Sequence, residues 1–136
     1  ALERGAHHVI NYAEEDFSRS VWDLTNKHGV DVVFEHVGKE TWAGSIRSLA
    51  NGGRMVTCGA TTGYDAMTDI RYLFSREISI LGSRGWQRQD LQQLSSVVWR
   101  GELTPIIDRI LPLENAIDGL LAMKNRDLTG KVIITP

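Results

Sequence analysis

Three glycine-containing segments of the chain are candidates for contact with a ligand, because each follows an apolar run that predicts a β-strand. They are residues 35–38 (Glu-His-Val-Gly), 58–63 (Cys-Gly-Ala-Thr-Thr-Gly) and 81–83 (Leu-Gly-Ser). Ligands of doubly wound sheets lie at the carboxyl ends of the strands. Small residues there let a flat ring or a ribose approach backbone N–H and C=O groups. Glycines also end strands without any function in α/β proteins, and the pattern alone leaves both interpretations open.

The common short motifs of catalytic and nucleotide-binding sites are absent from the 136 residues. The sequence has no G-x-G-x-x-G, no G-x-x-x-x-G-K-[ST], no H-E-x-x-H and no C-x-x-C. It also lacks the Tyr-x-x-x-Lys that a short-chain dehydrogenase needs for proton transfer. The four histidines are not spaced as metal ligands; they are His7, His8, His28 and His36. Cys58 has no basic neighbour in the sequence, so we expect it to be a small buried apolar residue and not a nucleophile.

Alternating strand and helix patterns predict the elements that position these segments. Strands are predicted at residues 8–11, 30–35, 54–58 and 78–81. Helices are predicted at residues 16–27 and 69–75. A third helix is predicted between them, with Thr41 as its N-cap and the glycine pair 52–53 as its stop. The run at 30–35 is β-branched and almost continuously apolar, which is typical of a strand covered on both faces. The alternation predicts a parallel sheet with helices on both faces.

The pattern changes near residues 82–85, where we expect a change of packing partner. Amphipathic helices are predicted at residues 90–100 and 113–124, with an extended segment at 104–111 between them and a last strand at 131–135. The first residues, from Ala1 to Gly5, resemble the final turn of a helix followed by its glycine stop. We therefore expect the sequence to be cut from a longer chain.

Composition narrows the class of protein and its partners. Hydrophobic residues make up 42% and charged residues 24% of the chain, with a net charge of -2 and both signs mixed. That balance predicts neither nucleic-acid nor membrane binding, and no apolar run approaches the ~18–20 residues that span a bilayer. The single cysteine excludes an internal disulfide framework, which favours a cytoplasmic location.

Six stretches, in order along the whole chain, resemble the medium-chain dehydrogenase/reductase family. They are residues 5–12 (GAHHVINY), 29–38 (GVDVVFEHVG), 49–63 (LANGGRMVTCGATTG), 78–83 (ISILGS), 101–116 (GELTPIIDRILPLENA) and 130–136 (GKVIITP). The zinc-type alcohol dehydrogenase and quinone oxidoreductase branches are the most similar. The resemblance implies the C-terminal part of an NAD(P)-dependent oxidoreductase that moves hydride to or from an alcohol, aldehyde, ketone or quinone.

The resemblance also implies an incomplete fold. Residues 1–83 would supply the third to sixth strands of a Rossmann-type doubly wound parallel sheet, without its first two strands and glycine loop. Residues 84–136 would return to a catalytic domain that precedes this chain, and zinc would be possible only in that missing N-terminal part. The family's chemistry belongs to the missing domain, so no catalytic residue is expected here. Glu35 and His36 are then expected to cap a strand end and not to act as acid and base.

Cofactor contacts follow from the resemblance position by position. Val37 and Gly38 would lie beside the ribose or nicotinamide of NAD or NADP. Backbone groups of Gly59, Ala60 and Thr61 would meet the carboxamide. Gly82 and Ser83 would close that end of the site, and Tyr12 would lie near the adenosine ribose. Lys131 would meet the pyrophosphate, although without the resemblance a solvated lysine before a final strand is the simpler interpretation.

Three expectations concern the isolated chain. The segment from Ile78 to Leu81 would form the outer strand of the sheet, which in the resembling family pairs with its twin, so we expect a homo-oligomer. Residues 8–11 would lack their neighbouring strand, so the segment before Asp16 is expected to be displaced, disordered or exchanged with a partner. The isolated chain is expected to be inactive. The alternative is a non-enzymatic truncated fragment that folds and self-associates without binding cofactor.

Overall fold

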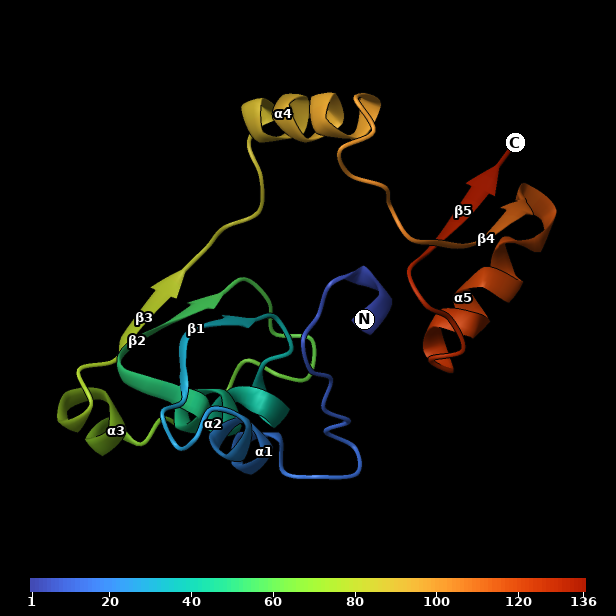
Figure 1. The fold of residues 1–136 in the computed structure, drawn as a ribbon. Coiled ribbons are helices and arrows are strands. Elements are labelled where there is room, and N and C mark those ends of the chain that lie inside the picture. The colour runs from blue at the N-terminus through green and yellow to red at the C-terminus, as the bar shows by residue number, and fades with distance from the viewer. The chain divides into compact units, whose positions relative to one another are not determined.

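A computed structural model describes all 136 residues, from Ala1 to Pro136. The chain divides into two compact units, Ala1–Gly85 and Trp86–Pro136. Strands and helices alternate within both units (Figure 1). None of the helices is long and apolar enough to cross a membrane.

The first unit is built on a three-stranded parallel sheet with the order β1-β2-β3. The strands are Val30–Glu35 (β1), Leu49–Thr57 (β2) and Ser79–Gly82 (β3). The unit opens with a 3-10 turn at Leu2–Arg4 (η1), followed by α1 (Phe17–Leu24), α2 (Lys39–Ser48) and α3 (Ile70–Ser75). Helices α2 and α3 connect successive parallel strands, so the predicted α/β class with a parallel sheet is confirmed.

The three helices of this unit lie on one face of its sheet (Figure 1). On the other face Val32 is 52%, Phe34 67% and Leu81 49% exposed. The prediction that β1 is covered on both faces, with helices on both sides of the sheet, is therefore wrong for these residues. A continuous apolar run shows that both faces of a strand are apolar, but it does not supply the layer that would cover the second face.

The core of the first unit lies between α2 and the sheet. Ile46 from α2 and Leu49 and Met55 from β2 are the buried centre, each 2% exposed or less. Helix α1 packs against α2 at Gly44, where a Cβ would lie 2.5 Å from the Phe17 ring. The missing side chain at position 44 therefore lets the two helices approach closely.

Two element boundaries differ from the prediction. Gly38, and not Thr41, is the N-cap of α2, so Thr41 lies in the first turn of the helix. Strand β2 begins at Leu49, five positions before the predicted start at Arg54, and includes the glycine pair at 52–53. Glycine pairs commonly end helices, but here the helix ends at Ser48 and the chain continues directly as an irregular strand with a shift in its pairing to β1.

Residues 8–11 form no strand, which corrects the element predicted there. Val9 is 58% exposed, and the sheet has β1 as an edge with no neighbour on that side. A strand needs a partner for its backbone N–H and C=O groups. The expected displacement of this segment from the sheet agrees with its irregular, exposed backbone.

The second unit contains a separate two-stranded parallel sheet. Its elements are α4 (Arg88–Trp99), β4 (Ile107–Pro112), η2 (Leu113–Asn115), α5 (Ala116–Lys124) and β5 (Lys131–Thr135). Helix α5 packs on the sheet at Gly119, where a Cβ would lie 3.1 Å from Val132 and 3.4 Å from Leu111. The predicted helix at 113–124 is thus present, with a 3-10 turn as its first three residues.

Candidate functional site

The carboxyl ends of β1, β2 and β3 meet at one edge of the first sheet, because the three strands are parallel. Two backbone hydrogen bonds align them beyond the last paired residues. Cys58 N–H donates to Glu35 C=O at 3.0 Å, and Ser83 N–H donates to Thr57 C=O at 2.8 Å. The structure therefore brings together most of the residues that the sequence suggests for a ligand site: Val37, Gly38, Gly59, Ala60, Thr61, Gly82 and Ser83.

The loops after β1 and β2 are joined to each other through their backbones. The carbonyl oxygen of Val37 accepts two hydrogen bonds from Thr62, one from its N–H at 2.8 Å and one from its Oγ1 at 3.0 Å. In addition, Lys39 N–H donates a hydrogen bond to Gly63 C=O at 3.1 Å. Gly38 has φ of 100°, and a Cβ on it would lie 2.7 Å from Gly63 O. The approach of the two loops therefore requires glycine at position 38.

The loop after β2 carries three consecutive backbone N–H groups without a protein acceptor. They belong to Gly59, Ala60 and Thr61. Gly59 and Ala60 line a cavity of about 220 Å³, whose wall also includes Gly38, Trp42 and Tyr64. Free backbone donors beside a cavity with an aromatic wall suit a flat polar ligand, such as a ring that carries an amide.

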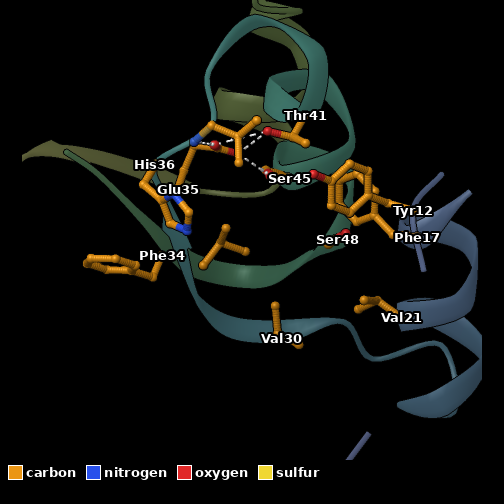
Figure 2. A pocket seen from close by; sticks show the side chains of 12 residues that line it. Tyr12, Phe17, Val21, Val30, Phe34, Glu35, His36, Thr41, Ser45 and Ser48 are labelled. Atoms are coloured by element: carbon orange, nitrogen blue, oxygen red, sulfur yellow. Dashed lines mark hydrogen bonds between the residues drawn. The ribbon is translucent and has the colours of Figure 1, made fainter. Parts of the chain in front are cut away.

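Glu35, the last residue of β1, is the most connected side chain of the site (Figure 2). The residue is buried, with 3% of its surface exposed. Oε1 accepts from Val37 N–H at 2.7 Å and from Gly38 N–H at 3.0 Å. Thr41 Oγ1 lies 2.9 Å from Oε2, and Ser45 Oγ donates to Oε2 at 2.5 Å. The carboxylate thus fixes the turn after β1 to the first two turns of α2.

These hydrogen bonds determine the charge state of Glu35. Burial by itself raises the pKa of the carboxyl group, but hydrogen bonds from Ser45, Gly38, Val37 and Thr41 outweigh burial and hold the pKa below its ordinary value of 4.5. Glu35 is therefore ionised at neutral pH.

The lowered pKa of Glu35 predicts a pH-dependent contribution to stability. A group with a lowered pKa in the folded state stabilises the fold above its unfolded pKa and loses that effect as the pH falls through its folded pKa. We expect the difference in unfolding free energy between the natural chain and Glu35→Gln to be constant near neutral pH. Below about pH 4.5 the difference should shrink. Urea unfolding at a series of pH values measures it, and a difference that grows as the pH falls would contradict the assignment.

His36 and Cys58 differ from their predicted roles. The side chain of His36 makes no hydrogen bond and caps nothing, whereas that of Glu35 does cap the turn as expected. Cys58 is exposed, which corrects the prediction of a small buried residue. It lies just past the end of β2 on a loop, where no element covers it. No three side chains of the His, Cys, Asp or Glu type lie close enough together to hold a metal ion.

Tyr12 and Lys131 are the two remaining residues that the sequence suggests for the cofactor site. Tyr12 borders a second cavity of about 290 Å³ beside β1, whose lining also includes Phe17, Phe34 and Val37 (Figure 2). Lys131 is the first residue of β5 in the second unit, where its N–H donates to Ile106 C=O at 2.9 Å. Its place at the site therefore stays a prediction.

The sequence is similar to proteins that are named as oxidoreductases or reductases. Quinone oxidoreductase-like protein 2 of Bos taurus is 30% identical over 145 residues, which cover 99% of this chain and 41% of that protein. Crotonyl-CoA reductase of Streptomyces avermitilis is 30% identical over 99 residues, or 73% of this chain and 22% of that protein. The chain thus spans less than half the length of these relatives.

Solved structures show the same fold. A crystal structure of an NAD-dependent alcohol dehydrogenase superposes with a TM-score of 0.85 and 35% identity, over 97% of this chain and 38% of that one. The alcohol dehydrogenase of Aeropyrum pernix superposes with a TM-score of 0.88 and 27% identity, over 98% of this chain and 38% of that one. A 2-octenoyl-CoA carboxylase reductase in complex with NADP superposes with a TM-score of 0.83 and 28% identity. The match covers 96% of this chain and 33% of that one.

The family described as zinc-binding dehydrogenase matches residues 4–134, which is nearly the whole sequence. This match confirms the resemblance to medium-chain dehydrogenases/reductases, and the chain belongs to the zinc-binding dehydrogenase family.

Proposed function

We propose that the chain is the C-terminal portion of an NAD(P)-dependent oxidoreductase that transfers hydride to or from an alcohol, aldehyde, ketone or quinone. The observation that carries the proposal is the row of free N–H groups at Gly59, Ala60 and Thr61, at the carboxyl edge of a parallel sheet. In doubly wound sheets this edge is where a nicotinamide cofactor binds. Membership of an oxidoreductase family gives the reaction class.

The residues present fit one half of such a cofactor. The amides of Gly59, Ala60 and Thr61 can donate to a carboxamide, the turn at Val37 and Gly38 offers a backbone surface, and Gly82 and Ser83 lie at the end of the adjacent strand. The cofactor, when bound, supplies the group that gives or accepts hydride. The pyrophosphate is normally held by a glycine loop at a helix N-terminus, and no such loop follows a strand in these residues.

The same proposal includes the domain organisation, the place of any zinc and the location of the protein. Residues 1–83 form part of the NAD(P)-binding domain, and residues 84–136 pack on the catalytic domain, which precedes them in the full-length protein. Zinc, if the enzyme uses it, is bound in that preceding part, and the protein is cytoplasmic. The choice between NAD and NADP depends on an acidic residue after the second strand of the domain.

The isolated chain is expected to bind NADH or NADPH only weakly and to be inactive. Lys131 is the one basic residue assigned to the pyrophosphate, and a charged hydrogen bond contributes about 1–3 kcal/mol. Micromolar affinity requires about 8 kcal/mol. Calorimetric titration of the purified chain tests this, and a low-micromolar dissociation constant would refute it.

In the full-length protein, Lys131→Ala is expected to weaken cofactor binding by at least about fivefold. The exposed lysine side chain has little packing to lose, so the thermal midpoint of unfolding should stay unchanged. Fluorescence titration with NADH and NADPH measures the affinity. Affinity within twofold of the parent, with the fold intact, would show that Lys131 is a solvated surface residue.

The proposed function itself is tested by hydride transfer in the full-length protein. Oxidation of NADH or NADPH should depend on an added quinone, aldehyde or ketone, and it should stop when either partner is omitted. The alternative, a truncated fragment that self-associates without cofactor, is favoured by the exposed apolar face at Val32, Phe34 and Leu81. The coding region upstream discriminates between them, because an in-frame strand, glycine loop and helix would support the enzyme.

A further inference from the structure

Glu35 is a buried anion without a cationic partner in the chain. The residue is 3% exposed, and its side chain takes part in none of the salt bridges. All of its donors are neutral: two backbone N–H groups and the hydroxyl groups of Thr41 and Ser45. Burying a charge without a counter-charge is costly, and here neutral hydrogen-bond donors alone offset that cost.

A neutral acceptor would satisfy the same geometry. The N–H groups of Val37 and Gly38 both donate to Oε1, and the oxygen of a glutamine amide can accept both. The hydroxyl groups near Oε2 can turn to accept a hydrogen bond instead of donating one. The shape of the turn therefore requires an oxygen at this position, whereas it does not require the negative charge.

The position of the charge points to a ligand. Oε1 lies 2.7 Å from Val37 N and 3.0 Å from Gly38 N, so a ligand resting on the outer side of this turn would be separated from the carboxylate by one layer of backbone. The nicotinamide ring is positively charged when oxidised and neutral when reduced. A nearby uncompensated carboxylate stabilises the charged ring more than the neutral one, and low solvent access strengthens this difference.

We propose that Glu35 is a positioning residue of the cofactor site, which holds the Val37–Gly38 turn against the loop after β2 and favours the oxidised, cationic nicotinamide. This inference rests on the proposed function, because it needs the cofactor to bind at this turn. The oxygen of Glu35 provides the geometry, and its charge provides the preference between the two oxidation states.

The test compares Glu35→Gln with Glu40→Gln in the full-length protein. Glu40 is exposed, lies in the first turn of α2, and its side chain makes no hydrogen bond, so E40Q removes the same charge from a solvated position nearby. Dissociation constants for the oxidised and reduced cofactor are measured by fluorescence titration and competition. For E35Q we expect the ratio of the two constants to shift by at least about threefold toward the reduced form. For E40Q we expect a shift within twofold.

Amide hydrogen exchange at Val37 and Gly38 in the same variants shows whether the turn is kept. Retained protection in E35Q together with the shifted ratio supports the proposal. An unchanged ratio, or an equal weakening of both forms, overturns it, because a merely structural residue would act on both alike. An E35Q variant that does not fold also contradicts it, since glutamine keeps the required oxygen. If the parent protein binds neither form of the cofactor, both this proposal and the proposed function fail. If the parent binds the cofactor but E35Q leaves the ratio of the two dissociation constants unchanged, only this proposal fails and the proposed function stands.

Discussion

Gly38→Ala is expected to lower the free energy of unfolding by more than about 3 kcal/mol. Gly38 adopts φ of 100° and ψ of -134°, a region that residues with a Cβ avoid. A Cβ there would also lie 2.7 Å from Gly63 O and 2.9 Å from Ala60 Cα. Both are backbone atoms, so relief requires the loop after β2 to move away from α2. Urea unfolding of the isolated chain measures the loss.

Gly52→Ala is the matched control for this substitution. Gly52 also has a positive φ, 73°, but a Cβ there would have no heavy atom within 4 Å. Gly52→Ala therefore measures the cost of a positive φ without a collision, about 1 kcal/mol. Equal losses of stability in the two variants would show that the two loops do not approach as closely as described.

The isolated chain is expected to form a homodimer or a larger oligomer at micromolar concentration. β3 is an outer strand of the sheet, and its backbone groups on the outer side have no partner. Leu81 is 49% exposed on the face that no helix covers, and exposed apolar surface of this kind drives association. Pairing of β3 with its twin about a two-fold axis, over the predicted segment from Ile78 to Leu81, would satisfy the edge. Light scattering gives the mass.

Two substitutions to lysine distinguish the two edges of the sheet. Leu81→Lys on β3 should shift the chain toward the monomer, because a charge at the two-fold contact faces its own copy. Phe34→Lys on β1, at the opposite edge, should leave the mass unchanged although it removes a larger apolar side chain. A monomeric natural chain, or dissociation by Phe34→Lys alone, would show that β3 is not the contact.

Local signals predicted the elements of the first unit well. Asp16 and Asp69 are N-caps of α1 and α3, and short polar side chains at these positions are recognisable from their neighbours alone. The segment at 8–11 failed for the opposite reason. Its composition suits a strand, but a strand also needs a neighbour, and β1 remains unpaired on that side. Strand pairing is a property of the whole sheet that composition does not carry.

The candidate site was predictable as far as it depends on strand order. Parallel strands place the residues after β1, β2 and β3 at one edge, so three apolar runs ending in glycine were enough to group them. The role of Glu35 was not predictable, because it depends on Thr41 and Ser45 facing back toward β1 once α2 has folded. Residues six and ten positions apart across a turn have no characteristic sequence signature.

The chain's own backbone at the carboxyl edge of the sheet offers the most direct test of the cofactor site. Amide chemical shifts of the isotope-labelled chain are followed by NMR during titration with NADH and, separately, with nicotinamide mononucleotide, which lacks the adenosine half. Binding is weak, so the titration extends to millimolar concentrations. With both ligands the largest shifts are expected at Gly59, Ala60 and Thr61, with smaller shifts at Gly38 and Ser83. Absence of shifts at these amides, or shifts confined to other parts of the chain, would contradict a nicotinamide site at the carboxyl ends of β1, β2 and β3.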